Sequence, residues 1–239
     1  MTKQTSTGSP AAAPTPAHHT LAAKPGRRGP YRKTAGRQQE ILDAALTVFG
    51  RSGYRSGSIR EIAETVGISQ AGILHHFENK DALLIAVLRH RDDLARGFYS
   101  LPLGITTLIS TLRVVEFNVA HPGAVELYCV LSAEATARNH PAHEYFVRRY
   151  AFLESVIGGA LGQMQAAGQL RDGVEPMAAA RSALALLDGL QLQWLLNRDS
   201  VDMVAAAETY FRQLATEDAW EAAIAAERDQ RQSTSVAAK

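Results

Sequence analysis

Two adjacent histidines within a helical pattern are of a residue type that suggests chemistry. His75 and His76 lie in the segment SIREIAETVGISQAGILHHFENK, which spans residues 58–80. A zinc site needs three or four converging ligands, but neighbouring residues on a helix point about 100° apart. No cysteine or acidic residue stands four positions after either histidine. We therefore expect neither His75 nor His76 to be a metal ligand.

A second histidine motif, HPAHE at residues 140–144, has the composition of a metal site. Pro141 puts His140 at a turn, so we expect His140 to help start the following helix instead. The sequence contains neither HExxH nor a glycine-rich phosphate-binding loop. We expect no catalytic residue, no metal and no cofactor, and we expect that the chain is not an enzyme.

The composition indicates a globular, all-α protein. The chain has 239 residues, of which 46% are apolar, 21% charged and 7% aromatic. Alanine and leucine recur in the second half, and both enter helices at little cost. Cys129 is the one cysteine, which excludes an internal disulfide and fits a reducing compartment. No apolar run reaches the roughly 18 residues of a membrane span, and no signal peptide begins the chain, so we expect a cytoplasmic protein without a membrane partner.

Charge divides the chain into a basic beginning and an acidic remainder. Residues 1–60 hold ten basic and two acidic residues, which leaves fifteen basic and twenty-two acidic residues for the rest. A basic end on an acidic body indicates contact with a polyanion, although a solvated tail would look the same. Residues 1–25 are rich in Ser, Thr, Pro and Ala and are predicted to be disordered. Residues 26–36 form a basic arm.

Apolar residues at helical spacing indicate the elements that would position these residues. One helix is expected over residues 38–54, with Gly50 and Gly53 ending it. Ser58 begins a capping box in which the Ser58 hydroxyl accepts from the Glu61 amide and the Glu61 side chain reaches back. Ser69 and Asn79 are predicted to cap the next two helices. Four or five further helices follow Leu101, with Ser200 capping one of them and the last near residues 217–228.

Residues 59–77 satisfy the geometry of a helix-turn-helix. Two short crossing helices need a small residue where their backbones meet, and Ala63 occupies that place. The turn needs a residue that tolerates a left-handed backbone, and Gly67 follows four positions later. Ile62, Val66 and Ile73, with Ile68, supply the apolar contact between the helices.

With its flanking helices, the segment at residues 37–84 resembles the amino-terminal domain of the TetR/AcrR family of transcriptional regulators. The matching features are ILDAALTVF, GY, SIREIAETVGIS, HHF and NKDALL, in order. The resemblance implies an all-α architecture with two domains: a three-helix DNA-binding domain at residues 37–80 and a helical effector-binding and dimerisation domain at residues 81–228. Residues 229–239 are expected to be a disordered tail.

The resemblance also implies which residues meet double-stranded DNA. Residues 70–76 would lie in the major groove, where Gln pairs with adenine and Ala contacts a thymine methyl. Leu74 and Gln70 replace the Tyr and Lys that are common in the family, which puts the base preference in doubt but not the docking. The full predicted set of DNA contacts is Tyr31, Arg32, Lys33, Arg37, Ser58, Ser69, Gln70, Ala71, Leu74, His75, His76 and Lys80.

Polar residues on apolar stripes of the second half are candidates for a small-molecule effector site. Buried hydrogen bonds, an interface or ordinary packing would explain them as well. The predicted ligand-binding residues are Glu116, Tyr128, Glu134, Phe152, Asp188, Gln191 and Trp194. The last two long helices are rich in small residues, and in this family such helices pair with their twins. The predicted dimer residues are Ala179, Ser182, Ala183, Leu186, Gly189, Leu190, Val204, Ala205 and Phe211.

These expectations combine into a homodimeric repressor of a palindromic operator, released by a small, largely apolar effector. An activator or a ligand-independent DNA-binding protein would keep the first domain and lose the effector response. A helical carrier or an enzyme would bind no duplex DNA.

Overall fold

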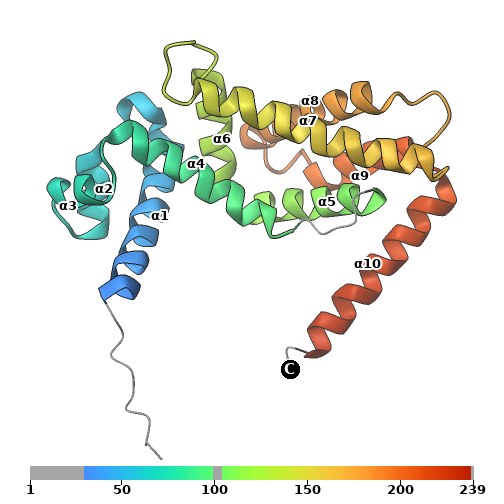
Figure 1. The fold of residues 1–239 in the computed structure, drawn as a ribbon, viewed down its shortest axis with the longest axis horizontal. Helices are drawn as coiled ribbons and strands as arrows, with labels where there is room; N and C mark the ends of the chain where they lie inside the picture. Colours follow the sequence, from blue (N-terminus) through green and yellow to red (C-terminus); the bar gives the residue numbers. More distant parts are fainter. Residues whose placement is uncertain (1–29, 99–103, 238–239) are drawn as a thin grey trace, which may run out of the picture.

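The computed structural model describes residues 30–98 and 104–237, and within them the chain forms ten α-helices (Figure 1). Apart from one isolated bridge between Leu170 and Ala215, these residues form no β-structure. The all-α prediction is confirmed. The helices are α1 (Pro30–Ser56), α2 (Ile59–Val66), α3 (Gln70–His76), α4 (Lys80–Arg96), α5 (Ile105–Ala120), α6 (Pro122–Glu134), α7 (His143–Ala166), α8 (Pro176–Leu196), α9 (Met203–Leu214) and α10 (Glu217–Ala237).

Side-chain caps set the starts of the short helices as the sequence predicts. The hydroxyl of Ser58 accepts from the Glu61 amide at 3.1 Å, and the hydroxyl of Ser69 accepts from the Gly72 amide at 3.1 Å. Asn79 caps α4 in the same way through the Ala82 amide. The reciprocal half of the Ser58 capping box is wrong, because the Glu61 carboxylate pairs with Arg51 of α1 instead.

A first core joins the helix-turn-helix to later helices. It holds buried residues of α1 to α4 together with Leu127 and Leu131 of α6 and Phe146 of α7. Gly50 lets α1 approach α6 closely, because a Cβ at this position would lie 2.9 Å from the carbonyl oxygen of Gly123. The apolar stripe of α4 that follows residue 80 therefore packs in the same core as α1 to α3.

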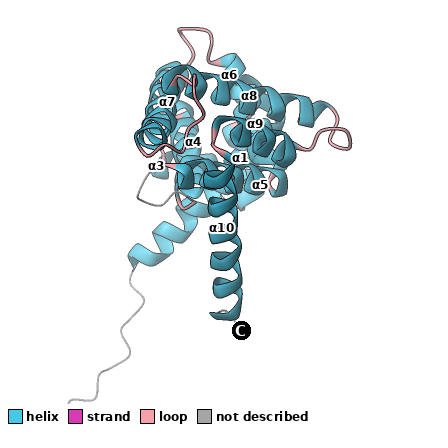
Figure 2. Cartoon of the chain, turned by 90° about the vertical axis from the view of Figure 1, so that its right-hand side faces the viewer, coloured by secondary structure: helices cyan, strands magenta, loops and turns pink. Residues whose placement is uncertain are grey.

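A second core fills the opposite end of the molecule. It is built from α5 and α7 to α10 around the fully buried Phe211 and Trp220, with Val125 from α6. Figure 1 shows α2 and α3 at one end and α7 to α9 at the other. In both views α10 projects from the helical body (Figure 2), although Arg113 of α5 pairs with Glu227 on it.

Several predicted boundaries move. Helix α1 begins at Pro30, so the second half of the basic arm is helical, and α1 continues through Gly50 to a break at Gly53. Asp202, not Ser200, caps α9, because its carboxylate accepts from the Ala205 amide at 3.0 Å. The predicted tail at residues 229–239 is wrong as far as Ala237, which ends α10. The predicted disorder of residues 1–25 lies outside the described residues.

Candidate functional site

The turn between α2 and α3 has the geometry that the sequence predicts. Gly67 adopts a left-handed backbone with φ 73° and ψ 34°, and its amide donates to Ala63 and Glu64. The amide of Ile68 donates to the Ala63 carbonyl at 3.0 Å, which closes the end of α2. Ala63 and Ile73 are buried between the two helices, so the helix-turn-helix prediction is confirmed.

Helix α3 presents one polar face outward. Gln70, Ala71, Leu74 and His75 are exposed, and Leu74 keeps 45% of its surface accessible. Ile73 and Phe77 are buried on the opposite face and hold α3 against the first core. All four belong to the predicted set of DNA contacts, and they share one surface.

The residues predicted to contact phosphate differ in their exposure and in the partners that they already have. Arg37 is exposed but tied to Glu40 at 2.7 Å, and Ser58 and Ser69 use their hydroxyls in the caps described above. Lys80 is half-buried: its Nζ atom donates to the Arg55 carbonyl at 3.3 Å and lies 4.5 Å from the centre of the Tyr54 ring. Burial lowers the pKa of Lys80. Lys80 must therefore turn away from these partners to reach a phosphate.

His76 is half-buried, and its ring meets that of His75 at 5.8 Å. Tyr31, Arg32 and Lys33 fall within the first turns of α1, and the structure describes none of their side chains.

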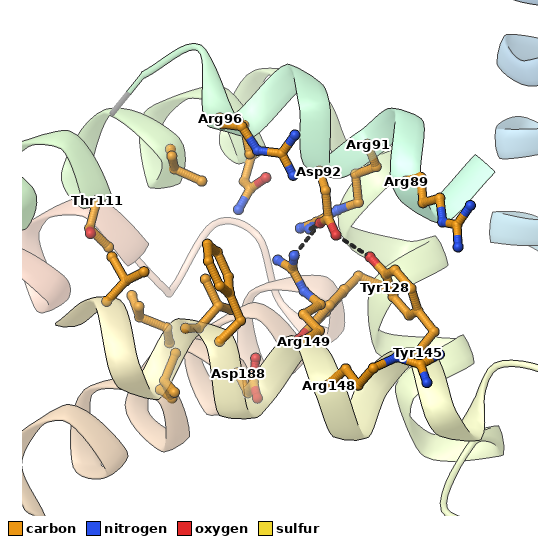
Figure 3. A pocket seen from close by; sticks show the side chains of 18 of the residues that line it. Arg89, Arg91, Asp92, Arg96, Thr111, Tyr128, Tyr145, Arg148, Arg149 and Asp188 are labelled. Atoms are coloured by element: carbon orange, nitrogen blue, oxygen red, sulfur yellow. Dashed lines mark hydrogen bonds and ion pairs between the residues drawn. The ribbon is translucent and has the colours of Figure 1, made fainter. Parts of the chain in front are cut away.

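A cavity of about 740 Å³ lies among α4, α5, α6, α7 and α8 (Figure 3). Such a volume suits a small organic molecule. Its apolar wall comes from α5, α7 and α8, and its polar wall comes mainly from α4 and α7. Four of the predicted ligand-binding residues line it: Tyr128, Phe152, Asp188 and Gln191.

Three predicted ligand-binding residues do not line this cavity. Glu116 is exposed and pairs with Arg231 of α10 at 2.9 Å, because α10 runs further than the sequence pattern indicated. Glu134 accepts a hydrogen bond from the Tyr54 amide at 3.1 Å, which ties α6 to the break in α1. Trp194 is buried in the second core. The assignments of Glu116, Glu134 and Trp194 to the ligand site are corrected accordingly.

Polar residues of α4 and α7 that the sequence reasoning missed form much of the cavity wall. Arg91 and Asp92 come from α4, and Tyr145 and Arg149 come from α7. Asp92 accepts from both Tyr145 and Arg149, as the dashed lines of Figure 3 mark. Arg91 follows Leu84 and Leu88 on the buried stripe of α4. A charged residue on an apolar stripe is therefore the sequence feature that could have predicted its place in the cavity wall.

Burial shifts the titration of the groups around the cavity. It raises the pKa of Asp188, although the hydrogen bond from the Tyr150 hydroxyl at 2.5 Å and the charge of Arg149 act in the opposite direction. Burial also raises the pKa of Tyr128 and lowers the pKa of Arg91. These groups are desolvated, so hydrogen bonds and ion pairs count for more here than at the surface.

The predicted dimer residues divide by exposure. Ala179, Ala183, Leu190 and Phe211 are buried inside the second core, so these four assignments are corrected: their side chains pack within the subunit. The remaining five keep exposed or half-exposed surface: Ser182, Leu186, Gly189, Val204 and Ala205. Two further apolar side chains of α8, those of Leu192 and Leu196, are 54% and 80% exposed.

The HPAHE motif behaves as a helix start. The Ala142 amide donates to Nδ1 of His140 at 3.2 Å, and α7 begins at His143. Across residues 30–98 and 104–237, no cluster of three or more His, Cys, Asp or Glu side chains has the arrangement of a metal site. No helix within those same ranges is long and apolar enough to cross a bilayer.

Comparison with known proteins identifies both halves of the chain. Residues 41–87 match the family of bacterial regulatory proteins of the tetR family. Residues 113–233, just over half of the chain, match the carboxyl-terminal domain of the BetI-type transcriptional repressors.

A transcriptional repressor of Mycobacterium tuberculosis, Rv1474c, is 28% identical over 177 residues, which cover 73% of this chain and 90% of the relative. A TetR-family regulator structure from a Rhodococcus species is 25% identical, with a TM-score of 0.58, over 74% of this chain and 95% of that one. A regulator from Saccharomonospora viridis, solved in complex with choline, shares the fold at 22% identity, with a TM-score of 0.63, over 77% of this chain and all of that one. The chain therefore belongs to the TetR family of DNA-binding transcriptional regulators and has a BetI-type carboxyl-terminal half.

Proposed function

We propose that this regulator is a homodimeric repressor that leaves its operator when a small molecule fills the cavity. Helix α4 is the observation that carries the proposal. Its first half is buried in the first core through Leu84 and Leu88, and its second half lines the cavity through Arg91 and Asp92. A ligand that moves the second half would shift a helix that packs against α1 and shares its core with α2 and α3.

On DNA, α3 would lie in the major groove with its exposed face against the base edges. Gln70, Ala71, Leu74 and His75 would touch bases, and the cap serines would hold phosphate near the starts of α2 and α3. His76 and Lys80, with Tyr31, Arg32, Lys33 and Arg37 on α1, would contact the backbone. Arg60 is exposed on α2 and is a further candidate for a phosphate contact.

The dimer would form through the exposed face of α8. Small residues and then leucines follow one another there at intervals of three and four positions: Ala178, Ser182, Ala185, Gly189, Leu192 and Leu196. Small residues let helices approach closely, and the two exposed leucines provide apolar area that association would bury. Val204 and Ala205 of α9 would extend this surface. Two α3 helices held in this way would read the two halves of a palindrome.

The effector part of the proposal rests on the cavity and on relatives of the same fold. The Saccharomonospora viridis regulator holds choline, so a protein with this architecture accommodates a small molecule. The buried stripe of α4 gives a physical route from such a ligand to DNA. A helical carrier would have no use for the helix-turn-helix that α2 and α3 form, so the presence of this motif argues against that alternative.

Selection from a random duplex pool tests the DNA half of the proposal. The full chain at physiological salt should enrich one palindrome, and Gln70→Ala should change the preferred base at one position of each half-site. Gln165→Ala is the matched control, because it makes the same change at an exposed site of α7, away from α3 and outside the proposed dimer surface. Bulk binding without an enriched sequence would overturn the proposal.

With the operator in hand, small molecules that stabilise the protein in a melt should lower operator affinity. Stabilising ligands that leave operator affinity unchanged would make the chain a ligand-independent regulator. If the bound protein increases transcription from the operator instead, it is an activator.

A further inference from the structure

We infer that the cavity binds an amphipathic anion, an aliphatic acid whose carboxylate pairs with Arg91 and whose chain lies against the apolar wall. The inference rests on the proposed effector role of the cavity and adds the chemical class of the effector. It also departs from the expectation of a largely apolar effector.

Arg91 is a buried cation without a complete set of partners. Its side chain is 5% exposed, and its nearest carboxylate oxygen, on Asp92, lies 3.9 Å from Nη1. Among the residues that the structure describes, none accepts a hydrogen bond from its Nε atom. The guanidinium lies over the ring of Tyr128, 4.5 Å from its centre. A guanidinium out of water needs hydrogen bonds from an anion, and the protein supplies only this long contact.

Asp92 is not available to complete that set. Its carboxylate already accepts from Tyr145 and forms a close ion pair with Arg149, whose side chain is also largely buried. The Tyr145 hydroxyl also lies 3.2 Å from the Leu88 carbonyl oxygen, so its one proton is shared between Asp92 and that carbonyl. Figure 3 shows Asp92 between these partners, with Arg91 beside it on α4. Arg91 is therefore the buried guanidinium of this wall that a ligand's carboxylate can reach without displacing a close ion pair.

The charges around the cavity favour an anion over a cation. Five arginines line it: Arg89, Arg91, Arg96, Arg148 and Arg149. The carboxylates that face them are Asp92 and Asp188 in the wall, Asp93 paired with Arg96 and Glu144 paired with Arg148. Five guanidiniums thus face four carboxylates, one of which, Asp188, is half-buried and accepts a hydrogen bond from the Tyr150 hydroxyl. The balance of charges at the polar wall therefore favours a carboxylate over a quaternary ammonium group.

The remainder of the wall fits an aliphatic chain with few polar groups. The apolar lining residues of α5, α7 and α8 are Val114, Val115, Val156, Ile157, Leu184 and Leu187, with Phe152 and Leu153. Gln191 interrupts this surface: its Oε1 atom is buried and has no hydrogen-bond donor among the described residues. One end of the cavity wall is thus cationic and much of the rest is aliphatic, which is the pattern of an amphipathic ligand.

Three probes that share one chain length test the charge of the head group on the full-length protein. These are decanoate, 1-decanol and decyltrimethylammonium, each below its critical micelle concentration, with dissociation constants measured by calorimetry. We expect decanoate to bind at least tenfold more tightly than 1-decanol, and decyltrimethylammonium to bind more weakly than either. Equal affinities of decanoate and decanol, or preference for the cation, would overturn the inference. This series needs no variant, so it does not depend on whether a variant folds.

Substitution at Arg91 then identifies the residue that pairs with the carboxylate. Arg91→Met removes the guanidinium, keeps an unbranched apolar side chain in place of the arginine stem, and should weaken decanoate binding at least tenfold while leaving 1-decanol binding unchanged. Arg91→Lys keeps the charge and should restore part of the decanoate affinity. Arg228→Met on α10 is the control, because it removes the same charge at an exposed site outside the cavity. If Arg91→Met lowers decanoate and decanol affinity equally, the residue only shapes the cavity and the inference fails.

The outcomes separate this inference from the proposed function. Decanoate binding through Arg91 without any change in operator affinity would support the ligand class and contradict the effector mechanism. Release from the operator by 1-decanol or decyltrimethylammonium, but not by decanoate, would support the mechanism and contradict the ligand class.

Discussion

Gly50 offers a sharp test of how tightly the two parts of the molecule are joined. It lies in α1, which packs on α6, and a Cβ built on it would be 2.9 Å from the carbonyl oxygen of Gly123 and 3.4 Å from the amide nitrogen of Leu127. Both neighbours are backbone atoms, so neither can rotate away. We predict that Gly50→Ala destabilises the protein although alanine is the better helix former.

The magnitude follows from two opposing terms. Replacing glycine by alanine inside a helix stabilises by about 1 kcal/mol. Forcing a methyl group into a tightly packed contact costs about 1–3 kcal/mol, because the helices must separate by a few tenths of an ångström. The net loss in the free energy of unfolding should be about 1 kcal/mol. Gly159→Ala on α7 is the matched control: the site is exposed and has nothing within 4 Å, so only the stabilising term applies.

Urea unfolding of both variants at one protein concentration gives the comparison, and the two should differ by about 2 kcal/mol in opposite directions from the parent. If Gly50→Ala is as stabilising as Gly159→Ala, α1 and α6 are not in rigid contact. The cavity would then be coupled to the helix-turn-helix through α4 and not also through the contact of α1 with α6.

Three further predictions address the cap, the tie between helices and the cysteine. Ser69→Ala removes the hydroxyl that caps α3 and should lower the free energy of unfolding in urea by about 1 kcal/mol. Ser69→Asp keeps a capping oxygen and should instead weaken DNA binding, because its carboxylate repels phosphate. Unchanged DNA binding by Ser69→Asp would refute the proposed docking of α3. Glu134→Ala leaves the Tyr54 amide without its acceptor and should lower the free energy of unfolding by about 1–3 kcal/mol. Glu134→Gln keeps an acceptor oxygen and should recover most of that loss. Equal losses in the two variants would show that the negative charge of Glu134 matters instead. Burial, with the charge of Asp188, raises the pKa of the Cys129 thiol to about 11. The rate of alkylation at pH 8 should therefore be about 100-fold lower than for a thiol of ordinary pKa, and this rate should increase with pH up to about pH 11. A rate that levels off near pH 9 would contradict this prediction.

The sequence alone determined the helix-turn-helix and its local geometry. Ser58, Ser69 and Asn79 cap the helices that the pattern assigned to them, and Gly67 adopts the left-handed turn. These features are local: a cap or a turn depends on residues three or four positions apart, so sequence spacing fixes it. The exposed face of α3 follows for the same reason, because the buried Ile73 orients the short helix.

Only the tertiary structure decided which polar side chains of the second half face a cavity. Glu116 stood on an apolar stripe, as Asp188 did, yet it pairs with Arg231, which lies 115 residues away in the sequence. Helical periodicity shows that one face of a helix is apolar and leaves open which neighbour covers it. Phe211 was assigned to a dimer surface and is covered by its own subunit, while Arg91 and Asp92 came to the cavity because α4, which begins in the first core, is long enough to reach it.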